Sequence, residues 1–282
     1  MRQILCALSS IAVALTATGC SSQPIRAAET AVARALISPQ QENQLGTQLH
    51  QQLEKEGMRY IQDKAVVDYV EQIARPILQQ AKRERPDVTF HLHVVDKPGE
   101  VNAFATPGGH LYVMSGLIGA VHNDAELAGV IAHEAGHVVA RHPARNMVQA
   151  YGLQTVAALA LGRNPSLLEQ IGATVVANGA LLAHSRSQEL EADEYGALYS
   201  AGAGYDPRAL ISFFQTLQRS EGRTPKVMTW LSTHPATSER ISRLQQFIAE
   251  KKLRGGQLNT VNQLASVQQR LGPGVGGAGA RR

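Results

Sequence analysis

Apolar residues recur every three or four positions over residues 40–85, and polar residues fill the positions between them. The apolar positions of this stretch are Leu45, Leu49, Leu53, Val66, Val67, Val70, Ile73 and Ile77. This spacing predicts amphipathic helix. Pro86 ends the stretch, because proline cannot continue a helical hydrogen-bond ladder.

Residues 88–96, with the sequence VTFHLHVVD, alternate between two faces and therefore predict a strand. His91 and His93 fall on the face opposite the apolar one, where we expect both to be exposed to solvent. A second metal site is disfavoured there, because no carboxylate is spaced to join the two histidines. A short extended segment, NAFA at 102–105, and a further strand, HLYVM at 110–114, flank a turn at 107–109.

Helical patterning returns at residue 123 and dominates the rest of the chain. Asn123 is a good N-cap for a helix that Pro143 closes. The apolar stretches 153–161 and 171–183 are too short to span a bilayer, and we expect them to be helices that pack in the protein rather than dip into a membrane. Further helices are expected over 185–202 and from about 205. Together these elements predict an α+β domain, mainly helical, with a small antiparallel sheet packed beside the helix that starts at 123.

The chain has 282 residues, of which 44% are hydrophobic and 18% charged, a size and composition that suit one sizeable domain. We assign that domain to residues 40–252. Residues 253–282 are rich in Gly, Gln, Asn and Ala, and we expect a disordered tail there. The net charge is only +4, and no basic run with interleaved aromatic residues is present, so nucleic acid is not an expected partner.

Residues 1–19 have the pattern of a signal peptide, with a positive start and a short apolar run. The segment ends in ATGC, which resembles a bacterial lipobox and would make Cys20 a lipidated residue, although Ala17 stands where leucine is more usual. The alternative is an ordinary cleaved signal with an incidental cysteine. Residues 20–39 would then form a tether. Without its signal segment the chain has no pair of cysteines for a disulfide.

The segment HEAGH, residues 133–137, places chemical groups in the middle of an apolar helix. His133 and His137 lie about 40° apart around a helix, so both imidazoles can reach one cation. Glu134 lies about 100° from His133, beside the cation, where a general base would take a proton from an attacking water. The pattern therefore indicates a catalytic zinc site, although HExxH alone also occurs by chance.

A catalytic zinc site needs a third protein ligand, which the helix over 185–202 offers. Glu189 and Asp193 are four residues apart and share a face, whereas Glu191 points about 160° away from Glu189. We assign Glu189 as the third ligand, Asp193 as an acceptor that orients a ligand histidine, His133 by preference, and Glu191 as a solvated acid; the reverse assignment of the two glutamates stays open. The small residues Gly136, Gly196 and Ser200 would let the two helices approach closely.

The remaining histidines have no partner at ligand spacing. His142 lies about 180° round the helix from His133, so we interpret it as a helix-end residue that the dipole favours. We interpret the others as structural or exposed; they are His50, His110, His122 and His184.

Four segments in this order resemble the metallopeptidases of family M48, which include HtpX-like and CaaX prenyl endoprotease-like enzymes. The segments are NAFATPGG at 102–109, HEAGH at 133–137, SRSQELEAD at 185–193 and THPATSERI at 233–241. The resemblance covers roughly residues 40–250. It implies a gluzincin fold with one Zn²⁺ per chain, for which His133, His137 and Glu189 are the ligands, Glu134 the general base and Asp193 the supporting acid.

The resemblance also implies a substrate strand and a further histidine near the metal. An extended substrate would lie along Asn102, Ala103, Phe104 and Ala105, since an edge strand offers unpaired backbone groups to a peptide. His234 would either occupy the fourth metal position in a self-inhibited state or stabilise the oxyanion during attack. A loop histidine with neither role is the third alternative.

The function that follows is a zinc endopeptidase of the bacterial cell envelope that cleaves misfolded or stalled envelope proteins. The lipoprotein-type signal points to the soluble periplasmic branch of this family, and we expect an anchor through Cys20 in the inner leaflet of the outer membrane, as Ser21 and Ser22 favour. The alternative is a chaperone or assembly factor for outer-membrane proteins with latent protease activity, which would have the outer-membrane assembly machinery as a partner.

Overall fold

A computed structural model describes residues 37–179, 181–220, 230, 232–235, 237–256 and 261–272. The expected signal peptide, Cys20 and most of the tether lie outside these residues. The helices are α2 (Pro39–Lys55), α3 (Lys64–Glu84), α4 (Ser115–Ala120), α5 (Asp124–Val139), α6 (His142–Tyr151), α7 (Leu153–Ala160), α8 (Pro165–Asn178), α9 (Arg186–Gly202), α10 (Ala209–Ser220), α12 (Ser238–Glu250) and α13 (Val261–Arg270). The strands are β1 (His91–Val95), β2 (Ala103–Ala105) and β3 (His110–Met114), with a short 3-10 turn, η1, at Pro107–Gly109.

The three strands form one sheet in the order β1-β3-β2. β2 and β3 are antiparallel, whereas β1 pairs in parallel with β3, with His91 opposite His110. The α+β class is therefore confirmed, but the expected antiparallel sheet is a mixed one. The turn at η1 makes β2 and β3 a hairpin, and β1 joins the free edge of β3, leaving β2 at the edge of the sheet.

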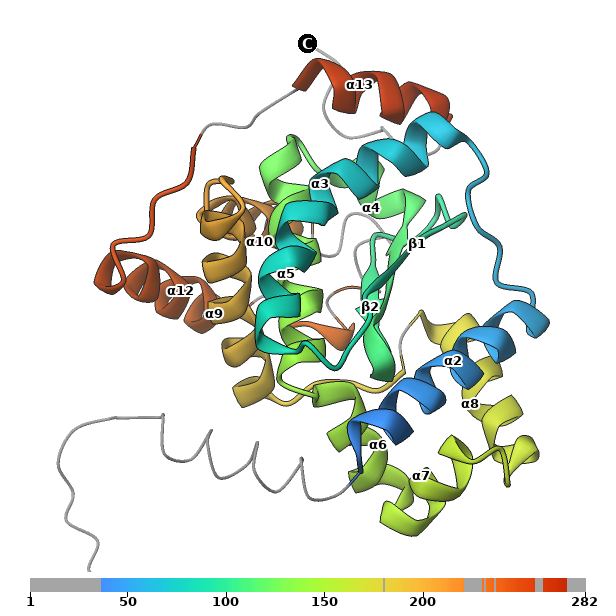
Figure 1. The fold of residues 1–282 in the computed structure, drawn as a ribbon. Coiled ribbons are helices and arrows are strands. Elements are labelled where there is room, and N and C mark those ends of the chain that lie inside the picture. The colour runs from blue at the N-terminus through green and yellow to red at the C-terminus, as the bar shows by residue number, and fades with distance from the viewer. Residues whose placement is uncertain are drawn as a thin grey trace, which may run out of the picture.

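Helix α5 lies in the centre of the molecule, between α9 on one side and the sheet on the other (Figure 1). Every residue of α5 is buried, which explains why its sequence is apolar on all sides except at the candidate metal ligands and acids. A Cβ on Gly136 would lie 2.7 Å from the Cβ of Tyr195, so only glycine permits the observed approach of α9. The prediction that small residues bring these two helices together is confirmed.

The sheet separates two apolar clusters. Alternate strand residues, including Ala103, Leu111 and Val113, pack with α3, α5 and α9. Residues of the opposite face, including Phe104 and Tyr112, pack with α2, α6, α7 and α8. Because side chains of a strand alternate between faces, this short sheet holds both halves of the domain in register.

Two expected helices are shorter than the sequence pattern predicts. The stretch 40–85 is divided into α2 and α3, because Gly57 takes a φ of +89° and Asp63 caps a new helix through Ala65 N–H. The helix from 123 ends at Val139, and Arg141, with a φ of +60°, redirects the chain so that His142 begins α6.

The expected disordered tail is wrong for residues 261–272. Helix α13 lies beside α3, and its Leu264 and Val267 are buried in the main core. The Gln268 side chain donates to the carbonyl oxygens of Ile118 and Val121. Residues 273–282 lie outside the described part of the chain.

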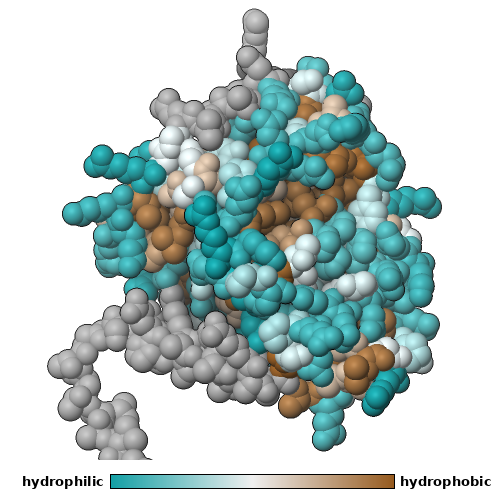
Figure 2. Space-filling model, in the orientation of Figure 1, coloured by the Kyte–Doolittle hydropathy of each residue, from teal (hydrophilic) through white to brown (hydrophobic). Residues whose placement is uncertain are grey.

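Among the described residues, no helix combines the length and the apolar character that crossing a membrane requires. Apolar surface is nevertheless gathered in places (Figure 2). One hollow of about 570 Å³ lies between α3 and the start of β1, where Ala74, Leu78, Phe90 and Leu92 line it. Two leucines at the ends of α7, Leu153 and Leu161, are also exposed.

Candidate metal centre

The two histidines of HEAGH lie on successive turns of α5 and face the same side. Their Nε2 atoms are 3.0 Å apart, and both side chains are fully buried. Burial holds the pKa of His137 well below its ordinary value, with a further contribution from His184. The ring is therefore neutral, which is the form that binds a metal ion.

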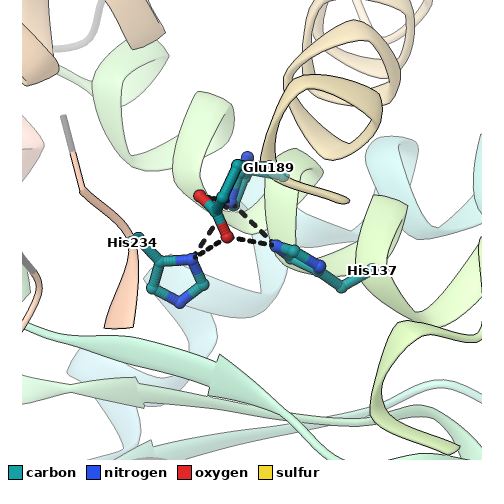
Figure 3. Close-up of side chains that lie close together, drawn as sticks. His137, Glu189 and His234 are labelled. Carbon is teal, nitrogen blue, oxygen red and sulfur yellow. Dashed lines mark hydrogen bonds and ion pairs between the residues drawn. The ribbon is translucent and has the colours of Figure 1, made fainter. Parts of the chain in front are cut away.

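Glu189 reaches this pair from the first turn of α9. Its carboxylate lies 3.4 Å from His137 Nε2 (Figure 3). The same carboxylate lies 3.6 Å from His133 Nε2. Ser185 begins α9 with a capping box, which fixes the direction of the turn that carries Glu189. The structure thus brings the three predicted ligands together from two helices that are about fifty residues apart in sequence.

His234 completes the group as a fourth donor. Its Nδ1 lies 2.9 Å from Glu189 Oε1 and 3.4 Å from His133 Nε2, and its ring stacks on Trp230 with centroids 4.5 Å apart. Ligand atoms at the corners of a tetrahedral zinc site are about 3.3 Å apart, given bonds of 2.0–2.1 Å. The five distances given above for these side chains, 2.9 to 3.6 Å, are close to that spacing. His234 therefore belongs to the same group of donors as His133, His137 and Glu189.

Glu134 lies beside the group. Its side chain is buried, and neither carboxylate oxygen has a hydrogen-bond partner among the described residues. One oxygen is 3.7 Å from Nε2 of His234. Burial raises the pKa of Glu134 above its ordinary value, against the opposing effect of His234 and His133. A raised pKa suits a carboxylate that must accept a proton and later release it.

Asp193 and Arg240 support the ligands from behind. Asp193 Oδ1 lies 3.0 Å from His133 Nδ1, the nitrogen that faces away from the other ligands. The Arg240 guanidinium donates to both Asp193 oxygens at 2.6 and 2.8 Å, and it lies 2.6 Å from Glu189 Oε2. Burial alone would raise the pKa of Asp193, but Arg240 and His133 hold it below its ordinary value. The sequence reasoning assigned no role to Arg240, although the residue lies within the THPATSERI segment.

Two predictions are wrong: that His142 lies at the end of the helix that carries His133, and that Glu191 is solvated. Because the chain turns at Arg141, His142 folds back onto α5, and its Nδ1 lies 2.8 Å from Nδ1 of His137. Glu191, which we expected to be solvated, is 8% exposed and lies 3.2 Å from His142 Nε2. His142 and Glu191 thus follow one another from the Nδ1 side of His137, as Asp193 lies at Nδ1 of His133.

The ring of His184 stacks on His137, with centroids 3.8 Å apart, so this histidine also belongs to the surroundings of the centre. The interpretation of His184 as a structural or exposed residue did not include this contact. Burial lowers its pKa well below the ordinary value, so it adds no positive charge near the ligands.

The charges of the centre suit a divalent cation. Glu134, Glu189 and Asp193 contribute three carboxylates, and the Arg240 guanidinium contacts two of them, Glu189 and Asp193, which leaves an excess of two negative charges when all three acids are ionised and His234 is neutral. Buried charges of one sign are costly unless they are paired or bind a metal. Two imidazoles, a carboxylate and an excess of two charges fit Zn²⁺ by donor type, number and spacing.

The predicted substrate strand borders the centre. Phe104 and Ala105 of β2 line the same narrow pocket as His184 and His234. Asn102, just before β2, is fully buried, donates to the carbonyl of Gly179 and accepts from the N–H of Ala103. The side chain of Asn102 therefore fixes the start of the strand.

The part of the chain that carries the metal centre is similar to known proteins. The model of peptidase family M48 matches residues 64–248. The chain is 31% identical over 186 residues to mitochondrial metalloendopeptidase OMA1 of Schizosaccharomyces pombe, which covers 66% of this chain and 54% of that protein. It is 28% identical over 222 residues to the beta-barrel assembly-enhancing protease of Escherichia coli. That match covers 74% of this chain and 44% of the relative. The chain thus matches about half of the length of these relatives.

Proposed function

Because the chain belongs to peptidase family M48, we propose that it is a zinc-dependent endopeptidase with His133, His137 and Glu189 as metal ligands and Glu134 as general base. The observation that carries the proposal is the convergence of these three donors beside a buried carboxylate that has no hydrogen-bond partner among the described residues. A structural metal site would have no use for such a carboxylate, since burying one without a partner is costly.

Glu134 and Asp193 have different roles in the proposed hydrolysis. A bound Zn²⁺ would polarise the scissile carbonyl and lower the pKa of the attacking water. Glu134 accepts the proton of that water and returns it to the leaving amine, a task for which its burial and raised pKa suit it. Asp193 holds the Nδ1–H of His133, so that Nε2 keeps its lone pair directed at the ligand group.

The test replaces Glu134 by Gln and measures zinc content and cleavage of unfolded casein. We expect Glu134→Gln to retain one zinc ion in this centre and to lose cleavage by at least a hundredfold, as the loss of a general base implies. Glu239→Gln is the matched control: it is an exposed glutamate at the start of α12 that pairs only with Arg186 among the described contacts. Cleavage by Glu134→Gln at the wild-type rate would refute the mechanism.

We further propose that the conformation described here is a latent one, in which His234 occupies the fourth metal position. Its Nδ1 lies within 3.4 Å of His133 Nε2 and 2.9 Å of Glu189 Oε1, distances that leave no room for a water between them. His234→Ala should then raise cleavage of short peptides. A fall in cleavage with zinc content unchanged would assign His234 to the oxyanion instead.

An extended substrate is proposed to lie along β2, from Asn102 to Ala105. Support comes from its place at the edge of the sheet and from the pocket that it shares with His234. A strand at a sheet edge can pair with a peptide through backbone groups.

For location and substrates, we propose a periplasmic protein, lipidated at Cys20 and held in the inner leaflet of the outer membrane, that cleaves unfolded or misassembled envelope polypeptides. The sequence ATGC supports the anchor, and the printed name of the Escherichia coli relative supports a connection with β-barrel assembly. Cys20→Ser should abolish incorporation of labelled palmitate and release the protein from membranes.

The second candidate is an assembly factor whose protease activity stays latent, which the placement of His234 favours. Complementation separates the two. If Glu134→Gln restores envelope assembly in a deletion strain as well as the wild type does, the assembly role does not need cleavage.

A further inference from the structure

A second group of histidines lies on the sheet and α2, built from residues outside the metal centre described above. His91 and His93 come from β1, His110 from β3 and His50 from α2. The parallel register pairs His91 with His110 and His93 with Tyr112, so the β1 and β3 histidines are neighbours on one face. Helix α2 covers that face and brings His50 onto them. The expectation that His93 is simply solvated is therefore wrong.

Three of these side chains converge. Nε2 of His93 lies 3.0 Å from Nδ1 of His110. The ring of His50 lies against both, with centroids 4.3 Å from His93 and 5.0 Å from His110. Each of the three offers a nitrogen within 4.8 Å of the other two. The ring of His91 stacks on that of His110, with centroids 4.7 Å apart, but His91 is exposed and outside the converging group.

The surroundings keep these rings neutral and supply an acid. Burial, with the neighbouring histidines, lowers the pKa values of His93 and His110 to about 3. The rings therefore carry free lone pairs at neutral pH rather than positive charge. Glu54, one turn after His50 on α2, places a carboxylate oxygen 3.7 Å from His50 Nε2. His50 is 20% exposed, so an ion can reach the group from solvent.

We propose that His50, His93 and His110 form a second metal site, which binds a divalent transition-metal ion of the Zn²⁺ type, with Glu54 or water as the fourth ligand. Three imidazoles with an open or carboxylate position are a donor set that zinc prefers, and their nitrogens already lie within 4.8 Å of one another. Because its ligands come from α2, β1 and β3, an ion there would join the first helix of the domain to the sheet. The proposal does not depend on the proposed peptidase function.

Packing alone does not require this arrangement. Apolar side chains could fill the space between α2 and the sheet, as they do elsewhere in the same cluster. Instead, ring nitrogens face one another at 3.0 Å, and one of the two must carry its proton to avoid lone-pair repulsion. A metal ion is the partner that satisfies several imidazole lone pairs at once.

The experiment counts metal ions. The full chain is freed of metal with a chelator and dialysed against buffered Zn²⁺, and zinc per chain is measured by mass spectrometry. We expect two ions for the wild type and one for His93→Gln and His50→Gln. His91→Gln is the matched control and should keep two, because His91 lies outside the converging group.

His137→Gln separates this site from the proposed catalytic one. It should lower the count from two to one and abolish cleavage, whereas His93→Gln should lower the count with the metal centre still loaded. Circular dichroism confirms that each variant is folded, and the partly exposed position of His50 makes its variant the milder one. One ion in the wild type, none in His137→Gln and still one in His93→Gln would overturn the proposal and leave a stack of imidazoles that only packs.

Discussion

Replacing Gly136 by alanine tests whether the contact between α5 and α9 sets the metal centre. The added Cβ would lie 2.7 Å from Tyr195 Cβ and 3.2 Å from the carbonyl oxygen of Ala192. Carbon atoms in contact are normally about 3.5–4.0 Å apart, so α9 must retreat by about 1 Å. Overpacking of this kind costs about 1–3 kcal/mol, and alanine returns about 1 kcal/mol of helix propensity. The net loss of stability is therefore about 0–2 kcal/mol.

The larger effect should be on metal binding. Glu189 is part of α9, and a shift of about 1 Å is half the length of a zinc–oxygen bond of about 2.0–2.2 Å. We expect zinc affinity to fall by about tenfold or more, because a ligand displaced by this amount no longer matches the ion. Isothermal titration with Zn²⁺ under chelator competition measures the affinity, and urea unfolding of the metal-free protein measures stability.

Gly202→Ala, at the end of α9, is the control. The nearest atom to its added Cβ is the flexible Gln80 side chain at 3.3 Å, which can move aside. This variant should keep wild-type affinity. If Gly136→Ala binds zinc as tightly as the wild type does, the close approach of the helices does not set the ligand geometry, and that reasoning fails.

Three further results are expected. Asp193→Asn should lower zinc affinity about 10–100-fold, measured by competition with a chelator, because the His133 Nδ1–H loses a charged acceptor. Glu191→Gln should lower it less, since its carboxylate acts through His142; an effect as large as that of Asp193→Asn would contradict this order. Asp87 has a pKa below its ordinary value, because its arginine contacts outweigh burial. Its contribution to stability is present above about pH 4, the unfolded value, and is lost as the pH falls through the folded pKa. Unfolding of Asp87→Asn from pH 7 to 3 should therefore show a smaller loss than the wild type, and an equal loss would refute the assignment.

The candidate ligands of the metal centre could be predicted from the sequence because they follow from residue spacing within single helices. His133 and His137 share a helix face through their spacing alone, and the same rule separates Glu189 and Asp193 from Glu191. The small residues on both helices indicated that the two faces can meet. Spacing could not show, however, that Glu191 would find a partner outside its own helix.

The missed residues depend on tertiary structure. His142 was misplaced because helical periodicity was continued through Arg141, whose left-handed conformation is unusual for a residue other than glycine and leaves no clear mark in the sequence. Arg240 is 47 residues from Asp193, and no local pattern predicts their contact. Its place in a segment that also contains the metal-centre histidine was the one available signal.

The predictions for the C-terminal tail and for the second histidine group were wrong for different reasons. For the tail, disorder was predicted from its amino-acid composition, although Leu264 and Val267 have the spacing of a helix. Both residues are buried against the core. The histidine group joins three elements, and its register depends on β1 pairing in parallel with β3, which the expected antiparallel sheet did not include.

The most direct test of the central claim is an anomalous difference map at the zinc edge from crystals of zinc-loaded Glu134→Gln protein. We expect a peak about 2.0–2.2 Å from Nε2 of His133, Nε2 of His137 and a carboxylate oxygen of Glu189. The absence of a peak between these three side chains, with Glu189 turned away from both histidines, would contradict that claim.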